Sequence, residues 1–329
     1  MNILANPDTE RLELGPQIHR YDGFQYHPLV TEDQRVDLAR HRLRQVASEF
    51  DRLLLVVARD DAGLVRGVLI AEPFDMGRRH FKIGMAHLQA FRLDPTYGDL
   101  ADREAMRAEL FGAYEAWRRE RGIVHTAFRI DSEDLETLHF LEARGFRLMD
   151  TIVAYLYNKH AIRRVPPLKS LFQLRDYRDD DREAIIELAS GRFQGTRFAR
   201  DVGLSAEGLN TFYREWAEKL CAGEMADRLM VAQTSEGQVV GFLGYKLDRM
   251  LEEVTGVRVM GGGLGAVSPK AAGAYPALLR TAIAEGAVTN DAAELETQVQ
   301  NGSVLRVWHA LRCTQVRVNH TLHCLSEPI

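Results

Sequence analysis

The segment from Leu264 to Leu279, LGAVSPKAAGAYPALL, has the residue types that an anion-binding loop requires. It passes from an apolar strand through a loop of Pro, Ala and Gly into a helix with an apolar stripe. Small residues let successive backbone N–H groups approach a phosphate, and the helix N-terminus adds unpaired donors and a positive dipole end. Lys270 would add a positive charge beside them. Turns of this composition are common between strands and helices, so an ordinary connecting loop remains the alternative.

Two other groups of residues could do chemistry but are better explained by structure. His320, His323 and Cys324 could be metal ligands, but on a strand positions 320 and 323 face opposite sides. Their spacing also differs from that of common zinc sites, so no metal site is expected. The glycines 261–263 indicate a bulge or a close backbone approach within a strand rather than a nucleotide-binding loop.

An internal repeat indicates which elements position the loop. Residues 55–67, LVVARDDAGLVRG, align without a gap with residues 229–241, LMVAQTSEGQVVG. Each segment reads as an apolar strand, a polar turn that ends in glycine, and a second apolar strand, which predicts a β-hairpin in each half. The positions that keep their residue type are Leu55, Val57, Ala58, Gly63, Val65 and Gly67.

After each hairpin the same order of elements is expected: a strand, a long amphipathic helix, a strand, a short helix and a last strand. The expected positions are 81–91, 106–117, 124–130, 135–145 and 146–157 in the first half, and 257–267, 278–283, 295–300, 304–311 and 316–325 in the second. This order predicts an α/β fold in which each half has a mixed, partly parallel sheet flanked by helices. Pro166 and Pro167 predict a linker at 163–170 between domains at 1–162 and 171–329.

The composition narrows the class of protein. A chain of 329 residues exceeds the usual size of one hydrophobic core, which favours two domains. No apolar run approaches the roughly 18 residues of a membrane helix, and the polar N-terminus does not resemble a secretory signal. Three widely spaced cysteines indicate a reducing compartment, so a cytoplasmic location is expected. The net charge of -5 argues against a nucleic-acid partner and favours a small-molecule partner.

The loop resembles the pyrophosphate loop of the GNAT superfamily of N-acyltransferases. Lys270, Gly273 and Tyr275 stand at the three fixed positions, where that family usually has Arg or Gln, then Gly, then Gly or Ala. Thr297, Gln298 and Asn301, followed by Leu305, Trp308 and Leu311, resemble the family's second signature. Two residues depart from the family pattern: Tyr275 stands where a small residue is usual, and Trp308 stands where many members have a Tyr that protonates the departing thiolate.

Longer stretches resemble one family of tandem GNAT proteins, the dTDP-fucosamine acetyltransferases. In the second half these stretches are FQGTRFARD at 193–201, FYREW at 212–216 and ETQVQN at 296–301. In the first half they are FDMGRRHFKIGMAHL at 74–88 and FLEARGFRLMDT at 140–151, which resemble that family's degenerate first domain. The likeness therefore covers most of the chain and implies two tandem GNAT-like domains.

The resemblance implies that the second domain binds acetyl-CoA, or another acyl-CoA, as a co-substrate. The Ala266 backbone would polarise the thioester carbonyl, and Asn301 would belong to the catalytic site. The implied cofactor-binding residues are Gly265, Ala266, Val267, Lys270, Ala271, Ala272, Gly273, Ala274, Tyr275, Asn301 and Trp308. Two alternatives remain open: Asn301 could be only a helix N-cap, and Leu305 and Leu311 could be only a core stripe.

The acceptor implied by the resemblance is a small-molecule amine, most specifically an amino-sugar nucleotide. Arg192, Arg197 and Gln298 are the candidate acceptor-binding residues, since arginine forks suit phosphates. Solvated surface charge is the alternative for both arginines. Rival functions are acylation of a peptide or antibiotic amine, use of a carrier-protein donor, and a sensor that binds acyl-CoA without transfer. The oligomeric state is left open, with a homodimer among the alternatives.

The first half lacks the residues that a cofactor would need. Asp94 to Tyr97 follow its central strand where the second half has the small-residue loop, and a carboxylate there would repel phosphates. Asp134 and Leu141 stand at the positions of Asn301 and Trp308. The first domain is therefore expected to be a scaffold that also forms part of the acceptor wall.

Overall fold

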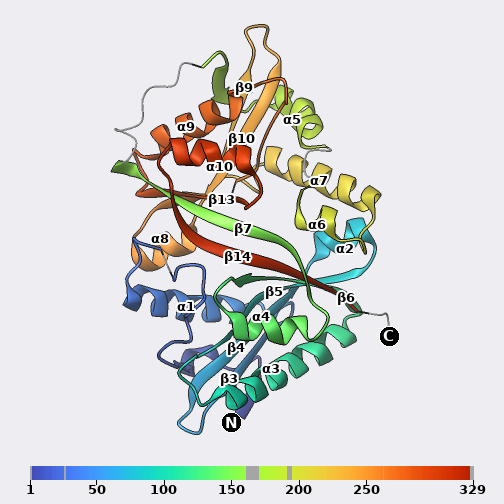
Figure 1. The fold of residues 1–329 in the computed structure, drawn as a ribbon, viewed down its shortest axis with the longest axis vertical. Coiled ribbons are helices and arrows are strands. Elements are labelled where there is room, and N and C mark those ends of the chain that lie inside the picture. Colours follow the sequence, from blue (N-terminus) through green and yellow to red (C-terminus); the bar gives the residue numbers. More distant parts are fainter. Residues whose placement is uncertain (1, 26, 161–169, 191–194, 262, 327–329) are drawn as a thin grey trace. The chain divides into compact units, whose positions relative to one another are not determined.

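The computed structural model describes residues 2–25, 27–160, 170–190, 195–261 and 263–326. They form two compact units: unit 1 comprises residues 1–151 and 318–329, and unit 2 comprises residues 152–317. Two long strands, β7 (Arg147–Asn158) and β14 (Thr314–Leu325), therefore each begin in one unit and end in the other (Figure 1). The expected contiguous domains, 1–162 and 171–329, do not include this exchange. Most of the expected linker at 163–170 lies outside the described residues.

Unit 1 is built on a sheet in the order β1-β3-β4-β5-β6-β14. Neighbours are antiparallel except β5 and β6, which are parallel, and β2 adds a short parallel pairing to β4. The strands, apart from β14, are β1 (Asn2–Ala5), β2 (Glu13–Leu14), β3 (Leu54–Arg59), β4 (Leu64–Pro73), β5 (Gly84–Leu93) and β6 (Ile123–Asp131). The helices are η1 (Thr9–Arg11), α1 (Glu32–Ala47), α2 (Asp75–Phe81), α3 (Leu100–Glu120) and α4 (Leu135–Glu142).

The sheet of unit 1 is covered on both faces. Leu54, Val56 and Ala58 of β3 pack in one core cluster with residues of α3, whereas Leu55 and Val57 pack in another with residues of α1. This division follows from the strand period of two, which sends successive side chains to opposite faces. The predicted stripe of α3 is confirmed, and its buried members are Met106, Leu110, Tyr114 and Trp117.

Unit 2 repeats the arrangement in the order β8-β9-β10-β11-β13-β7, in which only β11 and β13 are parallel neighbours. The strands, apart from β7, are β8 (Gln173–Asp176), β9 (Arg228–Gln233), β10 (Val239–Leu247), β11 (Val259–Gly261), β12 (Gly265–Val267) and β13 (Ala292–Gln298). The helices are η3 (Asp179–Asp181), α5 (Arg182–Ala189), α6 (Arg197–Arg200), α7 (Ala206–Cys221), α8 (Arg249–Thr255), α9 (Ala274–Gly286) and α10 (Gly302–Ala310).

The hairpins of the repeat have matching turns. Gly63 and Gly237 both have a left-handed backbone, with φ of 85° and 87°. The N–H of each donates to the carbonyl three residues earlier, on Asp60 and on Thr234, at 3.0 Å in both turns. Only glycine adopts this conformation without steric cost, which accounts for its presence at both positions. Each hairpin is followed by a short helix that the periodicity did not predict, α2 in unit 1 and α8 in unit 2.

The expected elements otherwise agree with the observed ones, except that the strand expected at 257–267 is interrupted. It consists of β11 and β12, separated by residues 262–264, and Gly262 lies outside the described residues. Among the helices that the structure describes, none is long and apolar enough to cross a membrane.

Asp94 fixes the loop that follows β5 in unit 1. Its side chain is fully buried. It accepts hydrogen bonds from the N–H and hydroxyl of Thr96 at 2.9 and 2.6 Å, and from Arg66 Nη1 at 2.8 Å. The Gln17 N–H adds a longer contact at 3.4 Å. Burial opposes ionisation, but these donors together outweigh it and lower the pKa of Asp94 below its usual value. The Asp94 carboxylate thus accepts hydrogen bonds from backbone N–H groups that a bound anion would need.

Replacing Asp94 by Asn should destabilise unit 1 in a pH-dependent way. Because the folded pKa is depressed, the ionised carboxylate stabilises the fold above the unfolded pKa of about 3.9, and this contribution disappears as pH falls through the folded pKa. We expect Asp94→Asn to lower the free energy of unfolding at pH 7 by about 1–3 kcal/mol, with a smaller difference near pH 3. Denaturant titrations at both pH values measure it.

Asp37→Asn is the matched control, because that side chain is 58% exposed and pairs with Arg40 on the surface. It should change the free energy of unfolding by less than about 1 kcal/mol. Equal losses in the two variants, or a loss for Asp94→Asn that does not change with pH, would contradict the role given to Asp94.

Candidate functional site

The parallel strands of unit 2 separate partway along their length. β11 pairs with β13 from Val259↔Ala292 to Gly261↔Glu294. Beyond this point β12 is hydrogen-bonded to β10 alone, and residues 295–298 of β13 pair only with β7. Within the described part of the chain, β12 pairs only with β10, and its other edge therefore has no strand partner. Gly263, one of the glycines for which a bulge or a close backbone approach was predicted, lies directly against the carbonyl of Gly244.

The register of β12 decides which of its backbone groups face this open edge. The Gly244 N–H donates to Leu264 O at 2.8 Å, and the Ser268 N–H donates to Val240 O at 2.7 Å. Since hydrogen-bonded pairs recur at every second residue of an antiparallel ladder, Ala266 and Phe242 form the pair between these two. The backbone groups of Ala266 therefore face β10.

Gly265 and Val267 are the residues of β12 that turn their N–H and C=O groups to the open edge. They stand opposite Leu243 and Gly241 in the register, at the non-hydrogen-bonded positions of the ladder. No partner for these groups is found among the residues that the structure describes. The Ala266 backbone groups, for which a contact with a thioester carbonyl was predicted, face β10 in this register, and that contact stays a prediction.

The loop from Ser268 to Gly273 leads from this edge into α9. Ala271 N–H donates to Ser268 O at 2.9 Å, and Ala274 N–H donates to Ala271 O at 3.1 Å. Gly273 is the N-cap of α9, with φ of 92° and no side-chain cap. In the described residues, the N–H groups of Ala272, Gly273 and Tyr275 have no hydrogen-bond acceptor.

These donors form a cradle at the positive end of a helix of 13 residues. Lys270 is exposed beside them and forms no ion pair within the described ranges. Unused N–H groups at a helix N-terminus, a glycine whose conformation admits a side chain only with strain, and an adjacent cation suit a phosphate or diphosphate. The cradle and the open edge of β12 together fit the diphosphate and the extended arm of an acyl-CoA.

Tyr275 and Trp308 join the first turn of α9 to α10. The indole Nε1–H of Trp308 donates to the phenolic oxygen of Tyr275 at 2.8 Å. Trp308 is 2% exposed, and its ring lies 5.5 Å from that of Tyr155 on β7. Burial raises the pKa of Tyr275, and the bond from Trp308 partly offsets this. The Tyr275 side chain thus extends toward α10. Its hydroxyl is bonded to Trp308 and not to the N–H groups of the cradle.

Asn301 holds the junction between β13 and α10. It is the N-cap residue of α10, but its side chain makes no bond to a helix N–H. Instead Nδ2 donates to Thr297 Oγ1 at 2.9 Å, and Oδ1 accepts from Ser303 Oγ at 3.0 Å. Gln298 is the last residue of β13, and its carbonyl accepts the Asn301 N–H at 2.9 Å. Both residues lie where β13 leaves the sheet.

Of the two predicted acceptor arginines, the structure describes one, and its role in acceptor binding stays a prediction. Arg197 lies on α6 with its guanidinium 4.6 Å from the centre of the Phe198 ring. Phe198 in turn packs edge-on against Phe212 of α7 at 5.0 Å. Arg192 lies outside the described residues.

An acidic pair on β13 was not singled out from the sequence. Arg317 Nη2 donates to Glu294 Oε1 at 2.8 Å and to Glu296 Oε1 at 2.6 Å. Burial raises the pKa of Glu294, with Arg317 opposing and Glu296 and Asp248 adding to the rise. Glu294 is also the last residue of β13 that pairs with β11. The alternation Glu294-x-Glu296 within a predicted strand was the available signal, because it places two carboxylates on one face.

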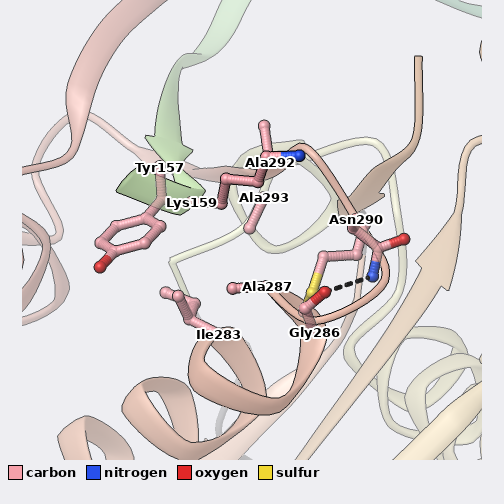
Figure 2. Close-up of a pocket in the computed structure, with 9 residues that line it drawn as sticks. Tyr157, Lys159, Ile283, Gly286, Ala287, Asn290, Ala292 and Ala293 are labelled. Atoms are coloured by element: carbon pink, nitrogen blue, oxygen red, sulfur yellow. Dashed lines mark hydrogen bonds between the residues drawn. The ribbon is translucent and has the colours of Figure 1, made fainter. Parts of the chain in front are cut away.

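A small cavity lies at the other end of α9 (Figure 2). Its volume is about 10 Å³, and it is lined mainly by apolar groups of α9, β13 and β7. Two buried polar atoms of its lining, Tyr157 Oη and Asn290 Oδ1, have no hydrogen-bond partner among the described residues. Figure 2 shows the Tyr157 hydroxyl directed away from Asn290, whose amide donates to Gly286 O. This volume suits one water molecule, whereas substrate pockets usually hold several hundred Å³.

Comparison with protein-family models gave no match, and comparison with curated protein sequences gave none either. Several solved structures are similar to this chain in fold. A GCN5-related N-acetyltransferase from Sphaerobacter thermophilus superposes with a TM-score of 0.61 at 14% identity, over 99% of this chain and 97% of that one. A tandem GNAT protein from the clavulanic acid biosynthesis pathway gives 0.57 at 14% identity, over 90% and 95% of the two chains.

A third similar structure is the glucosamine N-acetyltransferase region of a fungal multi-domain β-N-acetylglucosaminidase. Its TM-score is 0.59 at 13% identity, and the match covers 98% of this chain and 38% of that one. Identities this low establish the fold alone. The expected GNAT fold in a two-unit arrangement is confirmed, whereas the particular likeness to the dTDP-fucosamine acetyltransferases stays a prediction.

Proposed function

We propose that this protein is an N-acyltransferase that binds acetyl-CoA in unit 2 and acylates a primary amine of a small molecule. The supporting observation is the direct succession of an unpartnered strand edge at Gly265 and Val267 and a glycine-capped helix N-terminus with unused N–H groups. An extended thioester arm needs the first feature, and a diphosphate needs the second. The GNAT fold is consistent with both.

The residues of the site take separate roles in this proposal. The N–H groups of Ala272, Gly273 and Tyr275 hold the diphosphate, and Lys270 adds charge at the rim. Ala271 and Ala274, both buried, keep the loop packed against the unit. Gly265 and Val267 replace Ala266 as the source of backbone groups for the arm and the acyl carbonyl. Through Thr297, Asn301 positions the start of α10 and takes no chemical role.

When bound, acyl-CoA supplies an activated thioester. The chain holds the acceptor nitrogen near that carbonyl, and a backbone N–H of β12 stabilises the negative charge that develops on the carbonyl oxygen. Glu294 accepts the proton that the acceptor ammonium must lose before its nitrogen can attack. The carboxylate lies where β11 and β13 separate, and its raised pKa makes it a better proton acceptor.

An amino-sugar nucleotide is the acceptor that we favour, because the likeness to that family of tandem proteins extends over both halves. The similar fungal region carries the name glucosamine N-acetyltransferase, which adds an amino sugar to the candidates. The role of unit 1 in this proposal is a scaffold, since Asp94 already occupies the donors of its corresponding loop. The alternative is an acyl-CoA sensor without transfer, favoured by Tyr275 standing where the family has a small residue.

Acetyl-CoA should bind once per chain and depend on Lys270. Reversing the charge beside a diphosphate should cost on the order of 1 kcal/mol or more, so Lys270→Glu should raise the Kd at least about fivefold. Isothermal titration calorimetry measures both the stoichiometry and the Kd. Lys219→Glu on α7 is the matched control and should leave the Kd unchanged. Two sites per chain, or equal affinity in wild type and Lys270→Glu, would refute this assignment.

Transfer should be seen as thiol release when acetyl-CoA is combined with a suitable amine. A panel of dTDP- and UDP-linked amino sugars, free glucosamine, an aminoglycoside and a lysine-containing peptide tests the acceptor class with a thiol reagent. We expect release with at least one amino-sugar nucleotide. Turnover of the peptide or aminoglycoside alone would move the protein to the rival acceptor class, and binding without any turnover would favour the sensor.

Glu294→Gln should remove the proton acceptor while keeping the size of the side chain. With the best amine of the panel, we expect kcat at pH 7 to fall on the order of 100-fold, as is typical for loss of a general base. Glu296→Gln is the matched control, because Glu296 shares Arg317 but lies beyond the last pair with β11. It should retain kcat within about threefold. Similar losses in both variants would indicate that the carboxylates act only through Arg317.

A further inference from the structure

The two departures from the GNAT signatures contact each other. Tyr275 stands where a small residue is usual, Trp308 stands where a Tyr is usual, and the structure joins them by a hydrogen bond of 2.8 Å from indole N–H to phenol oxygen. α10 thus lacks the Tyr that the family usually has at position 308. α9 supplies a Tyr instead, and its phenol oxygen is hydrogen-bonded to Trp308. The pair therefore keeps one phenol hydroxyl in contact with α10.

The Tyr275 hydroxyl is poised to donate. Its oxygen already accepts the hydrogen bond from Trp308, so the remaining polar capacity of the phenol is its own hydrogen. No acceptor for that hydrogen is found within the described residues. The residue belongs to the first turn of α9, directly after the cradle, and α9 packs against β12, the strand with the open edge. The phenol is therefore attached to the helix that lies against both halves of the proposed acyl-CoA site.

We propose, on the basis of the acyl transfer proposed above, that the Tyr275 hydroxyl is the hydrogen-bond donor to the departing sulfur and that Trp308 is its positioning residue. In this step the acceptor nitrogen forms its bond to the acyl carbon as the carbon–sulfur bond breaks. The electron pair of that bond goes to sulfur, where the Tyr275 O–H stabilises it. Glu294 takes the first proton, from the acceptor ammonium, and releases it to solvent. The nitrogen loses a second proton as the amide forms, and this proton passes through water and converts the thiolate to the free thiol of coenzyme A.

The chemistry of the two side chains fits this division of roles. An indole N–H only donates and has no accessible acidity, so Trp308 itself has no acidic proton to give to sulfur. The hydrogen bond from Trp308 fixes the phenol oxygen of Tyr275 and leaves the phenol hydrogen available for another acceptor. Burial keeps the phenol neutral, so it stays an O–H donor over the whole working pH range. A thiolate whose conjugate acid has a pKa of about 8.5 needs stabilisation more than full protonation.

Tyr275→Phe, Trp308→Phe and the exchange variant Tyr275→Ala/Trp308→Tyr test the proposal. Removing one donor to a developing charge typically costs on the order of 100-fold in kcat, so we expect that loss for Tyr275→Phe and a loss within roughly tenfold for Trp308→Phe. The exchange variant restores the phenol to α10 and should recover kcat to within about tenfold of wild type. Thermal unfolding confirms that all three variants are folded.

Calorimetry provides a readout independent of turnover. At pH 9.5 the thiol of coenzyme A is largely ionised, so wild type should bind coenzyme A about tenfold more tightly than Tyr275→Phe. Acetyl-CoA has no free thiolate and should bind both proteins equally. A folded Tyr275→Phe variant with wild-type kcat, or one with tighter binding of acetyl-CoA, would overturn the proposal and show that Tyr275 obstructs the site. Absence of acetyl-CoA binding to wild type would overturn the proposed function itself.

Discussion

The antiparallel pairing of β12 with β10 is the interaction on which the site of unit 2 depends. β11 continues the sheet in the ordinary way, with β10 on one side and β13 on the other. The glycine-rich break then lets the chain follow β10 and leave β13. A strand with an unpaired edge is costly where water is excluded, because each N–H and C=O on that edge lacks a partner unless water or a ligand supplies one. Both the open edge and the direction in which the chain enters α9 follow from this pairing.

The two units solve the same local problem in opposite ways. Each has a loop that follows the central strand and precedes a long helix. In unit 1 the Asp94 carboxylate accepts hydrogen bonds from the donors of that loop, and Arg66 and Thr96 hold it there. In unit 2 the corresponding loop has alanines and a left-handed glycine, so its donors remain available. The two loops thus differ in one feature. In unit 1 the anion is a side-chain carboxylate of the chain itself, whereas in unit 2 the place is left for a bound anion.

Much of this arrangement could be predicted from the sequence, and the rest required long-range geometry. The hairpin repeat, the buried stripe of α3 and the loop with Gly273 follow from local periodicity and from the conformational freedom of glycine. The pairing of Ala266 depends on the register against β10, which a strand of three residues does not encode by itself. The same holds for Glu294, whose environment is set by Arg317 and by the point where two strands part. The short helices α2 and α8 were missed because a helix of about two turns is too short to show a clear hydrophobic period.

The exchange of terminal strands between the units has a consequence for synthesis on the ribosome. Unit 1 needs residues 319–325 to pair with β6, and these are made only after β13 of unit 2. Unit 2 needs residues 152–158 against β13, and these precede the rest of its sheet. The first half therefore leaves the ribosome with the edge of β6 uncovered, and it stays incomplete until β14 has been made. Unpaired edges recruit other strands, so the nascent first half is the stage at which this chain is most exposed to misassembly.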